Sequence, residues 1–146
     1  MEYEQLKLEN QVCFPLYAAS RLITRTYQPL LEELGLTYPQ YLVLMVLWNK
    51  EGLTVNAIAE KLILNTNTIT PLLKRMQENG ILTRERAKED ERKVIINLTE
   101  EGRNLRHKAA LVPEKLVKTL KDADLTNDEL FAMKKTLYKL IEILDK

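Results

Sequence analysis

Apolar residues recur at helical spacing along most of this chain, and the spacing changes to a strand-like pattern over a single segment. Residues 81–86 and 92–98 contain β-branched side chains and flank the polar turn 87–91, which is typical of one β-hairpin. A lone hairpin is not stable by itself, so it must pack against helices. Only four Gly and five Pro occur in 146 residues, which favours long helices over a many-stranded sandwich. The sequence therefore predicts a mainly α domain with a small β-hairpin.

Capping residues divide the rest of the chain into helical segments. Thr37 and Gln40 form one capping box, and Thr126 and Glu129 form another. Pro15 indicates that the first helix either starts near residue 14 or is kinked there. We expect helical segments over residues 6–34, 37–48, 55–62 and 65–79, a further one from residue 99 onward, and a last one over residues 126–144.

Two of the expected helices are short and joined by a tight turn. Residues 55–62 and 65–79 predict a helix-turn-helix, and with the hairpin that follows, residues 53–99 predict a winged helix-turn-helix. The flanking segments 1–34 and 100–146 predict long helices whose apolar stripes a domain of this size does not cover. A second copy of the chain is the simplest cover. We therefore expect one domain over residues 1–146 that forms a homodimer through its terminal helices.

The counts of single residue types exclude several mechanisms. One Cys and one His are too few for a structural zinc site or an internal disulfide, so we expect no metal and no cofactor, and His107 is interpreted as a surface residue. The net charge of +1 gives no bulk signal for nucleic acid. The longest apolar run, residues 41–48, is far short of the about 18 residues that a membrane span needs. Because the start of the chain also lacks a secretory signal, we expect a cytoplasmic protein.

Several stretches of the sequence carry a resemblance to a known family. The run DERKVIINLT at residues 90–99 resembles the wing motif of MarR-type bacterial transcription regulators, and TPLLKRM at residues 70–76 resembles their recognition helix. Residues 8–14, with Tyr17 and Tyr27, and LTYPQY at residues 36–41 resemble the one-cysteine organic-hydroperoxide regulators (OhrR) of that family. Two residues depart from the pattern: Pro15 replaces an aliphatic residue or Ser, and Asn67 replaces a Gly.

The resemblance implies a transcriptional regulator, and most simply a repressor, that binds double-stranded operator DNA. Asn and Thr side chains at the start of the second helix of the helix-turn-helix suit adenine edges and thymine methyl groups in the major groove, although the same residues also suit plain helix capping. Arg92 suits the minor groove. Asp90 is expected to hold the Arg92 side chain by a charge-assisted hydrogen bond, and the alternative is an ordinary surface ion pair without a role in DNA binding. Two copies are expected to read a pseudo-palindrome. The predicted DNA-binding residues are Asn65, Thr66, Asn67, Thr68, Thr70, Lys74, Arg75, Arg84, Arg86, Lys88, Asp90 and Arg92.

Cys13, the single cysteine, lies near the expected start of the first helix, where the helix dipole favours a thiolate. By default a lone cysteine is a small buried hydrophobe. The resemblance implies instead a redox sensor, with Tyr17, Tyr27 and Tyr38 as hydrogen-bond partners, the last two from the other subunit. Two hydrogen bonds to a charged group, at roughly 1.5–3 kcal/mol each, are enough to stabilise the thiolate. An organic hydroperoxide would oxidise it to a sulfenic acid, and a low-molecular-weight thiol would cap the product.

Three other functions remain open at this point. One is a MarR-type repressor that is released by a small aromatic effector bound at the dimer junction, with Cys13 as a packing residue. Another is a thiol peroxidase, which the sequence disfavours because it has no thioredoxin-like strand–helix alternation and no second cysteine. The third is an interaction module that does not bind DNA, which the wing residues disfavour. We therefore expect a regulator and not an enzyme.

Overall fold

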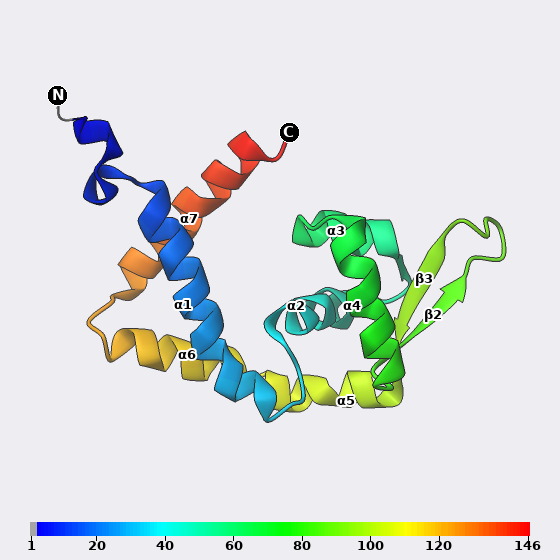
Figure 1. Ribbon diagram of the computed structural model, residues 1–146. Coiled ribbons are helices and arrows are strands. Elements are labelled where there is room, and N and C mark those ends of the chain that lie inside the picture. The colour runs from blue at the N-terminus through cyan, green and yellow to red at the C-terminus, as the bar shows by residue number, and fades with distance from the viewer. Residues whose placement is uncertain (1–2) are drawn as a thin grey trace.

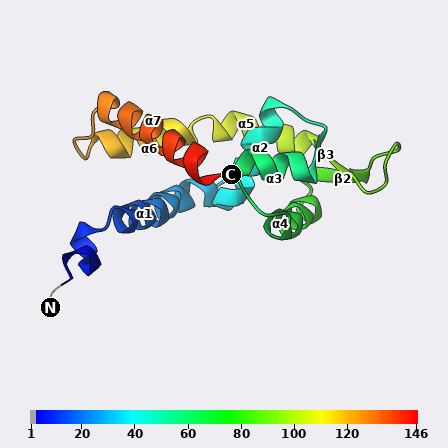
Figure 2. The same ribbon diagram turned by 90° about the horizontal axis from the view of Figure 1, so that it is seen from above.

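The computed structural model describes residues 3–146. The terminal helices α1, α6 and α7 lie at one end of the molecule, α2, α3, α4 and the hairpin lie at the other, and α5 connects the two ends (Figure 1, and Figure 2 from above). In chain order the elements are two 3₁₀ helices (Glu4–Leu6 and Leu8–Asn10), α1 (Cys13–Glu32), α2 (Tyr38–Asn49), β1 (Leu53–Thr54), α3 (Val55–Leu62), α4 (Thr66–Glu78), β2 (Leu82–Arg86), β3 (Val94–Leu98), α5 (Glu100–Ala109), α6 (Val112–Lys121) and α7 (Asn127–Leu144).

The predicted winged helix-turn-helix is confirmed, with one strand added. Helices α3 and α4 follow each other through a short turn, and β2 and β3 pair antiparallel from Leu82↔Leu98 to Arg86↔Val94. The two-residue strand β1 pairs with the other edge of β3, so the sheet order is β1-β3-β2. The sequence predicted a hairpin alone because a strand of two residues is too short to show any alternation.

Side-chain caps begin the helices where the sequence places them. Thr37 accepts from the Gln40 N–H while the Gln40 side chain accepts from the Thr37 N–H, which completes the capping box of α2. Thr126 and Glu129 do the same at α7. Thr54 caps α3 by accepting from the Ala57 N–H at 3.1 Å. These local bonds satisfy N–H groups that have no partner within the helix.

Two helix boundaries differ from the predictions, and a proline marks each difference. Residues 4–10 form two 3₁₀ turns, and α1 begins only at Cys13, so that Pro15 lies in its first turn, where the missing N–H costs no helical bond. Beyond residue 99 there are three helices, α5, α6 and α7, where the sequence predicted two. Pro113 is in the first turn of α6. It cannot extend α5, because it lacks the N–H that would bond to the Ala109 carbonyl.

The hydrophobic core lies between α2 and the winged helix-turn-helix. Leu44 and Leu47 of α2, Ile58 of α3, Leu73 of α4 and Ile96 of β3 are almost completely buried and belong to one cluster. Burial of a Leu or Ile side chain contributes about 1.5–3 kcal/mol to folding. The core therefore holds α4 and the hairpin in a defined relation to each other.

Polar contacts attach α5 to this core. Arg103 donates to both carboxylate oxygens of Glu51, at 2.7 and 2.8 Å, and Glu51 also accepts from the Leu98 N–H. The Arg103 hydrogen bonds, with the Leu98 N–H acting in the same direction, hold the pKa of Glu51 below its usual value. The Trp48 indole N–H donates to the Gly102 carbonyl at 2.9 Å. These bonds therefore attach α5, which follows the hairpin, to the segment between α2 and β3.

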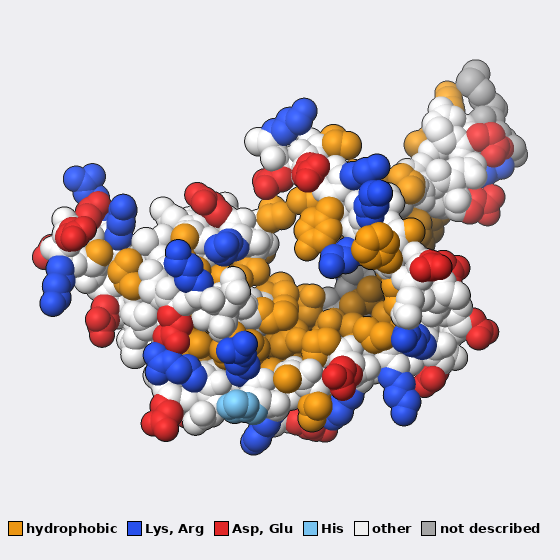
Figure 3. Space-filling view, turned by 180° about the vertical axis from the view of Figure 1, so that it is seen from behind, with side chains coloured by type: hydrophobic (Ala, Val, Ile, Leu, Met, Phe, Trp, Pro, Cys, Tyr) orange, Lys and Arg blue, Asp and Glu red, His pale blue; other side chains and the backbone are white. Residues whose placement is uncertain are grey.

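The terminal helices leave most of their apolar side chains exposed. Helix α1 buries only Leu31, and α7 buries none of its residues. Phe131 and Leu144 of α7 are 70% and 72% exposed. Hydrophobic side chains line the hollow between the two ends of the molecule (Figure 3). Across residues 3–146, every helix is either too short or too polar to pass through a bilayer.

Candidate nucleic-acid interface and sensor site

The polar side chains predicted at the start of α4 lie on the surface of the molecule. Asn65 is the N-cap, and its side chain accepts from the Asn67 N–H at 2.8 Å. Thr66, Asn67 and Thr68 are exposed in the first turn. Helix α4 buries the opposite face, which carries Ile69, Leu72, Leu73 and Met76. The expected capping role of Asn65 is therefore present, and the three residues after it are available to a partner.

The turn before α4 has a strained residue that sets the direction of the helix. Ile63 ends α3 with φ 54° and ψ 44°, in the left-handed region. This conformation costs a residue with a side chain about 1–2 kcal/mol. Its backbone reversal lets the Leu64 N–H donate to the Ala59 carbonyl at 2.9 Å. Backbone hydrogen bonds to the end of α3 therefore help to hold the tight turn in place.

In the wing, Asp90 stabilises the loop more than it holds the Arg92 side chain. The Asp90 carboxylate accepts from the Arg92 backbone N–H at 3.1 Å, whereas its distance to the Arg92 Nε is 3.9 Å. The second distance is too long for a hydrogen bond. With its side chain 95% exposed, Arg92 forms only a loose ion pair, worth about 0–1 kcal/mol. Lys88 and Arg86 are exposed on the same hairpin.

A groove of about 370 Å³ lies between α3, α4 and the wing, and we call it the α3–wing groove. It brings together four of the predicted residues: Thr66, Thr70, Arg84 and Arg92. Lys74, Arg75, Arg86 and Lys88 do not line it. The sequence analysis did not single out Asn56 or Lys93. Asn56 could have been noticed because it is a polar side chain in the first turn of α3, two positions after the capping Thr54. The full lining is Thr54, Val55, Asn56, Thr66, Thr70, Arg84, Arg92, Lys93 and Val94.

Cys13 is the first residue of α1, and it is exposed. Tyr17 follows one helical turn later on the same side of the helix. The Arg21 guanidinium lies over the Tyr17 ring, 5.0 Å from its centroid, which is within the range of a cation–π contact. In the described part of the chain, no group of three or more His, Cys, Asp and Glu side chains is placed to share a metal ion.

Three tyrosines form a cluster between α1 and α2. The rings of Tyr27 and Tyr38 are 4.8 Å apart, and Tyr41 lies 6.0 Å from Tyr27. Burial, with a further contribution from the neighbouring Tyr38 and Tyr41 phenols, raises the pKa of Tyr27 to about 12. Burial also raises the pKa of Tyr38. These phenols therefore stay protonated at neutral pH and are hydrogen-bond donors. The sequence analysis did not name Tyr41 as a site residue. Its position one helical turn after Tyr38 indicates that the two rings lie on the same side of α2.

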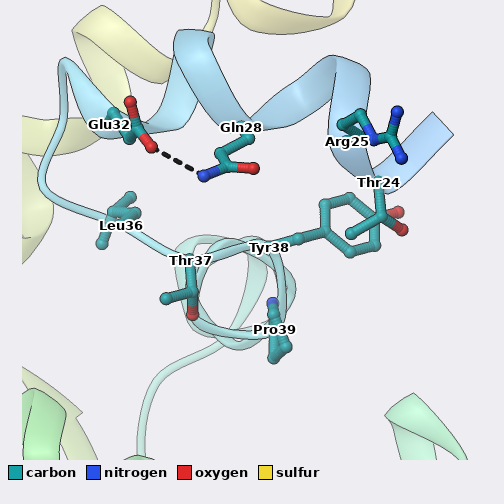
Figure 4. A pocket seen from close by; sticks show the side chains of 8 residues that line it. All are labelled: Thr24, Arg25, Gln28, Glu32, Leu36, Thr37, Tyr38 and Pro39. Atoms are coloured by element: carbon teal, nitrogen blue, oxygen red, sulfur yellow. Dashed lines mark hydrogen bonds between the residues drawn. The ribbon is translucent and has the colours of Figure 1, made fainter. Parts of the chain in front are cut away.

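A single chain does not bring Cys13 together with Tyr27 and Tyr38. Tyr27 follows Cys13 by 14 positions in the same helix, which is about 21 Å along the axis at 1.5 Å per residue. Beside Tyr38 lies a cavity of about 450 Å³ between α1 and α2. Gln28 donates to Glu32 there at 2.8 Å, and Arg25 is the one cation of the lining (Figure 4). The lining residues are Thr24, Arg25, Gln28, Glu32, Leu36, Thr37, Tyr38 and Pro39.

Comparison with known proteins shows relatives that match over nearly the whole chain. A family model described as transcriptional regulator SarA/Rot matches residues 25–109. The chain is 47% identical over 143 residues to the organic hydroperoxide resistance transcriptional regulator of Bacillus subtilis, which covers 98% of this chain and 95% of that protein.

Solved structures match as well. Reduced AbfR of Staphylococcus epidermidis bound to DNA has a TM-score of 0.79 and 36% identity, with 100% of both chains covered. Overoxidized AbfR bound to DNA has a TM-score of 0.73 and 35% identity, with 99% of this chain and 100% of that chain covered. A MarR-family regulator from Rhodococcus sp. RHA1 shares the fold, with a TM-score of 0.81 and 23% identity over 92% of this chain and 95% of that one. The chain therefore belongs to the MarR family of DNA-binding transcriptional regulators, and within it to the organic hydroperoxide resistance type.

Proposed function

We propose that this protein is a homodimeric repressor that leaves its operator when an organic hydroperoxide oxidises Cys13. One observation carries the proposal: within a chain, the exposed thiol at the start of α1 lies about 21 Å along the helix axis from Tyr27, against which Tyr38 packs. A chain therefore cannot complete its own sensor. A second copy, related by a two-fold axis, supplies the missing half at each of two equivalent sites.

The exposed terminal helices support the dimer. An apolar helix face is stable in water only when another surface covers it, and neither α1 nor α7 finds that cover within the chain. A two-fold pair also explains how a short α4 is sufficient for recognition. Two recognition helices about 34 Å apart read both halves of a pseudo-palindrome in successive major grooves.

We assign the DNA contacts by exposure and side-chain chemistry. Thr66, Asn67 and Thr68 suit base edges in the major groove, and we assign the half-buried Thr70 and the cap residue Asn65 to the same contact. Lys74 and Arg75, exposed further along α4, suit backbone phosphates. In the wing, the extended Arg92 suits the minor groove, with Asp90 holding its loop and with Arg86 and Lys88 beside it. Since its target is chromosomal DNA, the protein acts in the cytoplasm.

The proposed sensor reaction has two steps, an oxidation of the Cys13 sulfur and a condensation of the product with a small thiol. Protonated Tyr27 and Tyr38 of one subunit donate hydrogen bonds to the Cys13 thiolate of the other, and Tyr17 does so within the same chain. The thiolate attacks the terminal oxygen of the hydroperoxide; an S–O bond forms, the O–O bond breaks, and the alkoxide takes a proton to leave as an alcohol. The resulting sulfenic acid condenses with a low-molecular-weight thiol to give a mixed disulfide and water.

The capping step is the one that we expect to release DNA. AbfR, a relative, has been captured on DNA in both a reduced and an overoxidized form, which supports a regulator that works through its oxidation state. It also indicates that added oxygen alone need not separate protein from DNA. A mixed disulfide removes the thiolate and places a bulky group between the subunits, which favours a dimer whose recognition helices no longer match the operator.

A mobility-shift assay on the DNA upstream of the protein's own gene tests this function. We expect the wild-type protein to bind that DNA and to be released by an organic hydroperoxide together with a small thiol. Cys13→Ser should bind equally well and remain bound under the same treatment. If peroxide and thiol release the Cys13→Ser protein, Cys13 is not the sensor; if the reduced wild-type protein does not bind, the regulator proposal itself fails.

One observation favours a second candidate, a repressor released by a small aromatic effector. The cavity beside Tyr38 is large enough for such a molecule, and Arg25 lies at its edge, so an aromatic carboxylate suits it. In this case Cys13, which is exposed in a single chain, would only pack at the dimer junction. Release of the Cys13→Ser protein from DNA by an aromatic acid, without any peroxide, would support this candidate over the redox sensor.

A further inference from the structure

The α3–wing groove has the charge of an anion site. Three of its lining residues, Arg84, Arg92 and Lys93, are cations, and no carboxylate is among the others. Asn56, Thr66 and Thr70 add amide and hydroxyl groups. The N-terminal end of α3, where backbone dipoles point their positive ends, also borders the groove. The protein as a whole carries a net charge of only +1, so this local excess is not a consequence of overall composition.

Arg84 differs from the other basic residues of the wing because its side chain is partly buried on the face of the sheet that meets the helices, whereas Arg86, Lys88 and Arg92 are exposed. Arg84 lies directly opposite Ile96 on the neighbouring strand, and paired residues of antiparallel strands place their side chains on the same face. Ile96 is fully buried in the core, so Arg84 extends from that same face into the floor of the groove. Arg92, by contrast, extends into solvent.

The Arg84 guanidinium has a donor without an acceptor. Its Nε is buried, and within residues 3–146 no hydrogen-bond partner reaches it. Buried polar atoms in proteins are nearly always paired, because an unpaired one loses its bonds to water without replacement. A guanidinium is also rigid, with donors in a fork that matches two oxygens of a phosphate. Because Arg84 also lines the groove, the rest of its guanidinium is available to an acceptor group that enters the groove from outside.

We propose that the α3–wing groove binds one phosphodiester of the DNA backbone, with Arg84 as its main ligand and Asn56 as a second donor. The inference rests on the DNA binding proposed above. With α4 in the major groove and the wing in the adjacent minor groove, the strand that separates the two grooves must cross between α4 and the wing. The α3–wing groove is located there. Arg84 is therefore a backbone contact that sets the register of the protein on DNA and reads no base.

Fluorescence anisotropy tests the proposal by measuring DNA affinity over about 50–300 mM KCl. Two labelled duplexes of equal length are used: one has the upstream sequence, and the other has the same bases in scrambled order. Arg84→Gln should weaken binding to both duplexes by a similar factor, about tenfold to a hundredfold, and should lower the slope of log affinity against log salt by about one. Asn56→Asp should weaken binding more than Asn56→Ala, because it places a negative charge against the phosphate. The control Arg106→Gln makes the same charge change on an exposed position of α5 and should leave the slope unchanged.

Several outcomes would overturn the phosphate site. One such outcome is that Arg84→Gln weakens binding to the upstream duplex but not to the scrambled one. Another is that Asn56→Asp and Asn56→Ala weaken binding by the same factor. A third is that Arg84→Gln and Arg106→Gln have the same affinity and the same salt slope. Circular dichroism melts of each variant identify a loss that comes from unfolding, and the Asn56 pair keeps the test valid if Arg84→Gln does not fold. If the wild-type protein binds both duplexes equally, the regulator proposal fails, while the Arg84 comparison on scrambled DNA still decides the phosphate site.

Discussion

Mixed dimers provide the sharpest test of a sensor shared between two chains. Two heterodimers of identical composition are made from differently tagged copies. In the first, one chain carries Cys13→Ser and the other carries Tyr27→Phe and Tyr38→Phe; in the second, all three substitutions are on one chain and the other chain is wild type. Each heterodimer has a single Cys13, but only the first leaves that cysteine facing intact tyrosines across the dimer.

The size of the expected effect follows from the geometry. A sulfur–oxygen hydrogen bond requires contact within a few ångströms, and about 21 Å separates Cys13 from Tyr27 along the helix axis in one chain. Tyr27 and Tyr38 therefore cannot act on the thiol of their own chain, and Tyr17 is the same in both heterodimers. Two hydrogen bonds to a charged acceptor stabilise it by roughly 1.5–3 kcal/mol each, whereas an ordinary thiol is only about 3% ionised at pH 7. Since a stabilised thiolate is also less nucleophilic, we expect the first heterodimer to react about fivefold to thirtyfold faster.

Alkylation with iodoacetamide under pseudo-first-order conditions, followed by intact-mass spectrometry, measures the rate for the single cysteine. The two parental homodimers are the controls: the Cys13→Ser dimer should take up no label, and the double-Phe dimer should react at the slow rate. Faster alkylation of the second heterodimer would place the tyrosines beside the cysteine of their own chain. Equal rates in the two heterodimers would show that Tyr27 and Tyr38 do not activate the thiol.

Three further predictions concern the wing, the tyrosine cluster and the packing of α5. Arg92→Ala should weaken operator binding and lower the salt slope by about one, and a salt titration that matches wild type would remove Arg92 from the interface. Because the pKa of Tyr27 is raised to about 12, its protonated form is favoured in the fold; this stabilisation is complete below pH 10 and is lost between pH 10 and about 12. Urea unfolding should therefore show a smaller alkaline loss of stability for Tyr27→Phe than for wild type, and equal losses would contradict the burial of this phenol. A Cβ at Gly102 would lie 2.1 Å from the Ile81 carbonyl oxygen, so Gly102→Ala should lower the free energy of unfolding by about 1–3 kcal/mol in urea denaturation; an unchanged unfolding midpoint would show that α5 shifts without cost.

Signals that act between near neighbours in the chain were reliable guides to this fold. The Thr37 and Thr126 capping boxes begin α2 and α7 where the residues themselves predict, because the bonds of a capping box join residues only three positions apart. The hairpin is equally local. Strand β1 was missed because its pairing partner in β3 lies more than forty positions away, and nothing within Leu53–Thr54 encodes that contact.

The candidate sites likewise combine residues that the sequence indicated with contacts that only the tertiary structure shows. The sequence indicated Arg84 and Arg92 as wing residues, but only the strand register shows that Arg84 faces the helices while Arg92 faces solvent. Asn56 joins them from α3 through the packing of three elements. No spacing rule links these positions, because the distances between them are set by how the core holds α3, α4 and the hairpin together.

By itself, the sequence determined most of the helices, the capping boxes of α2 and α7, the wing motif and the presence of a single cysteine. Each of these depends on residues that are near one another in the chain or on simple counts. Tertiary structure decided which side chains meet: it gathered Tyr27, Tyr38 and Tyr41 into one cluster, and it left Cys13 far along α1 from them. The physical reason is that a straight helix keeps distant positions apart by its rise per residue, whereas contacts between elements depend on the packing of the whole core.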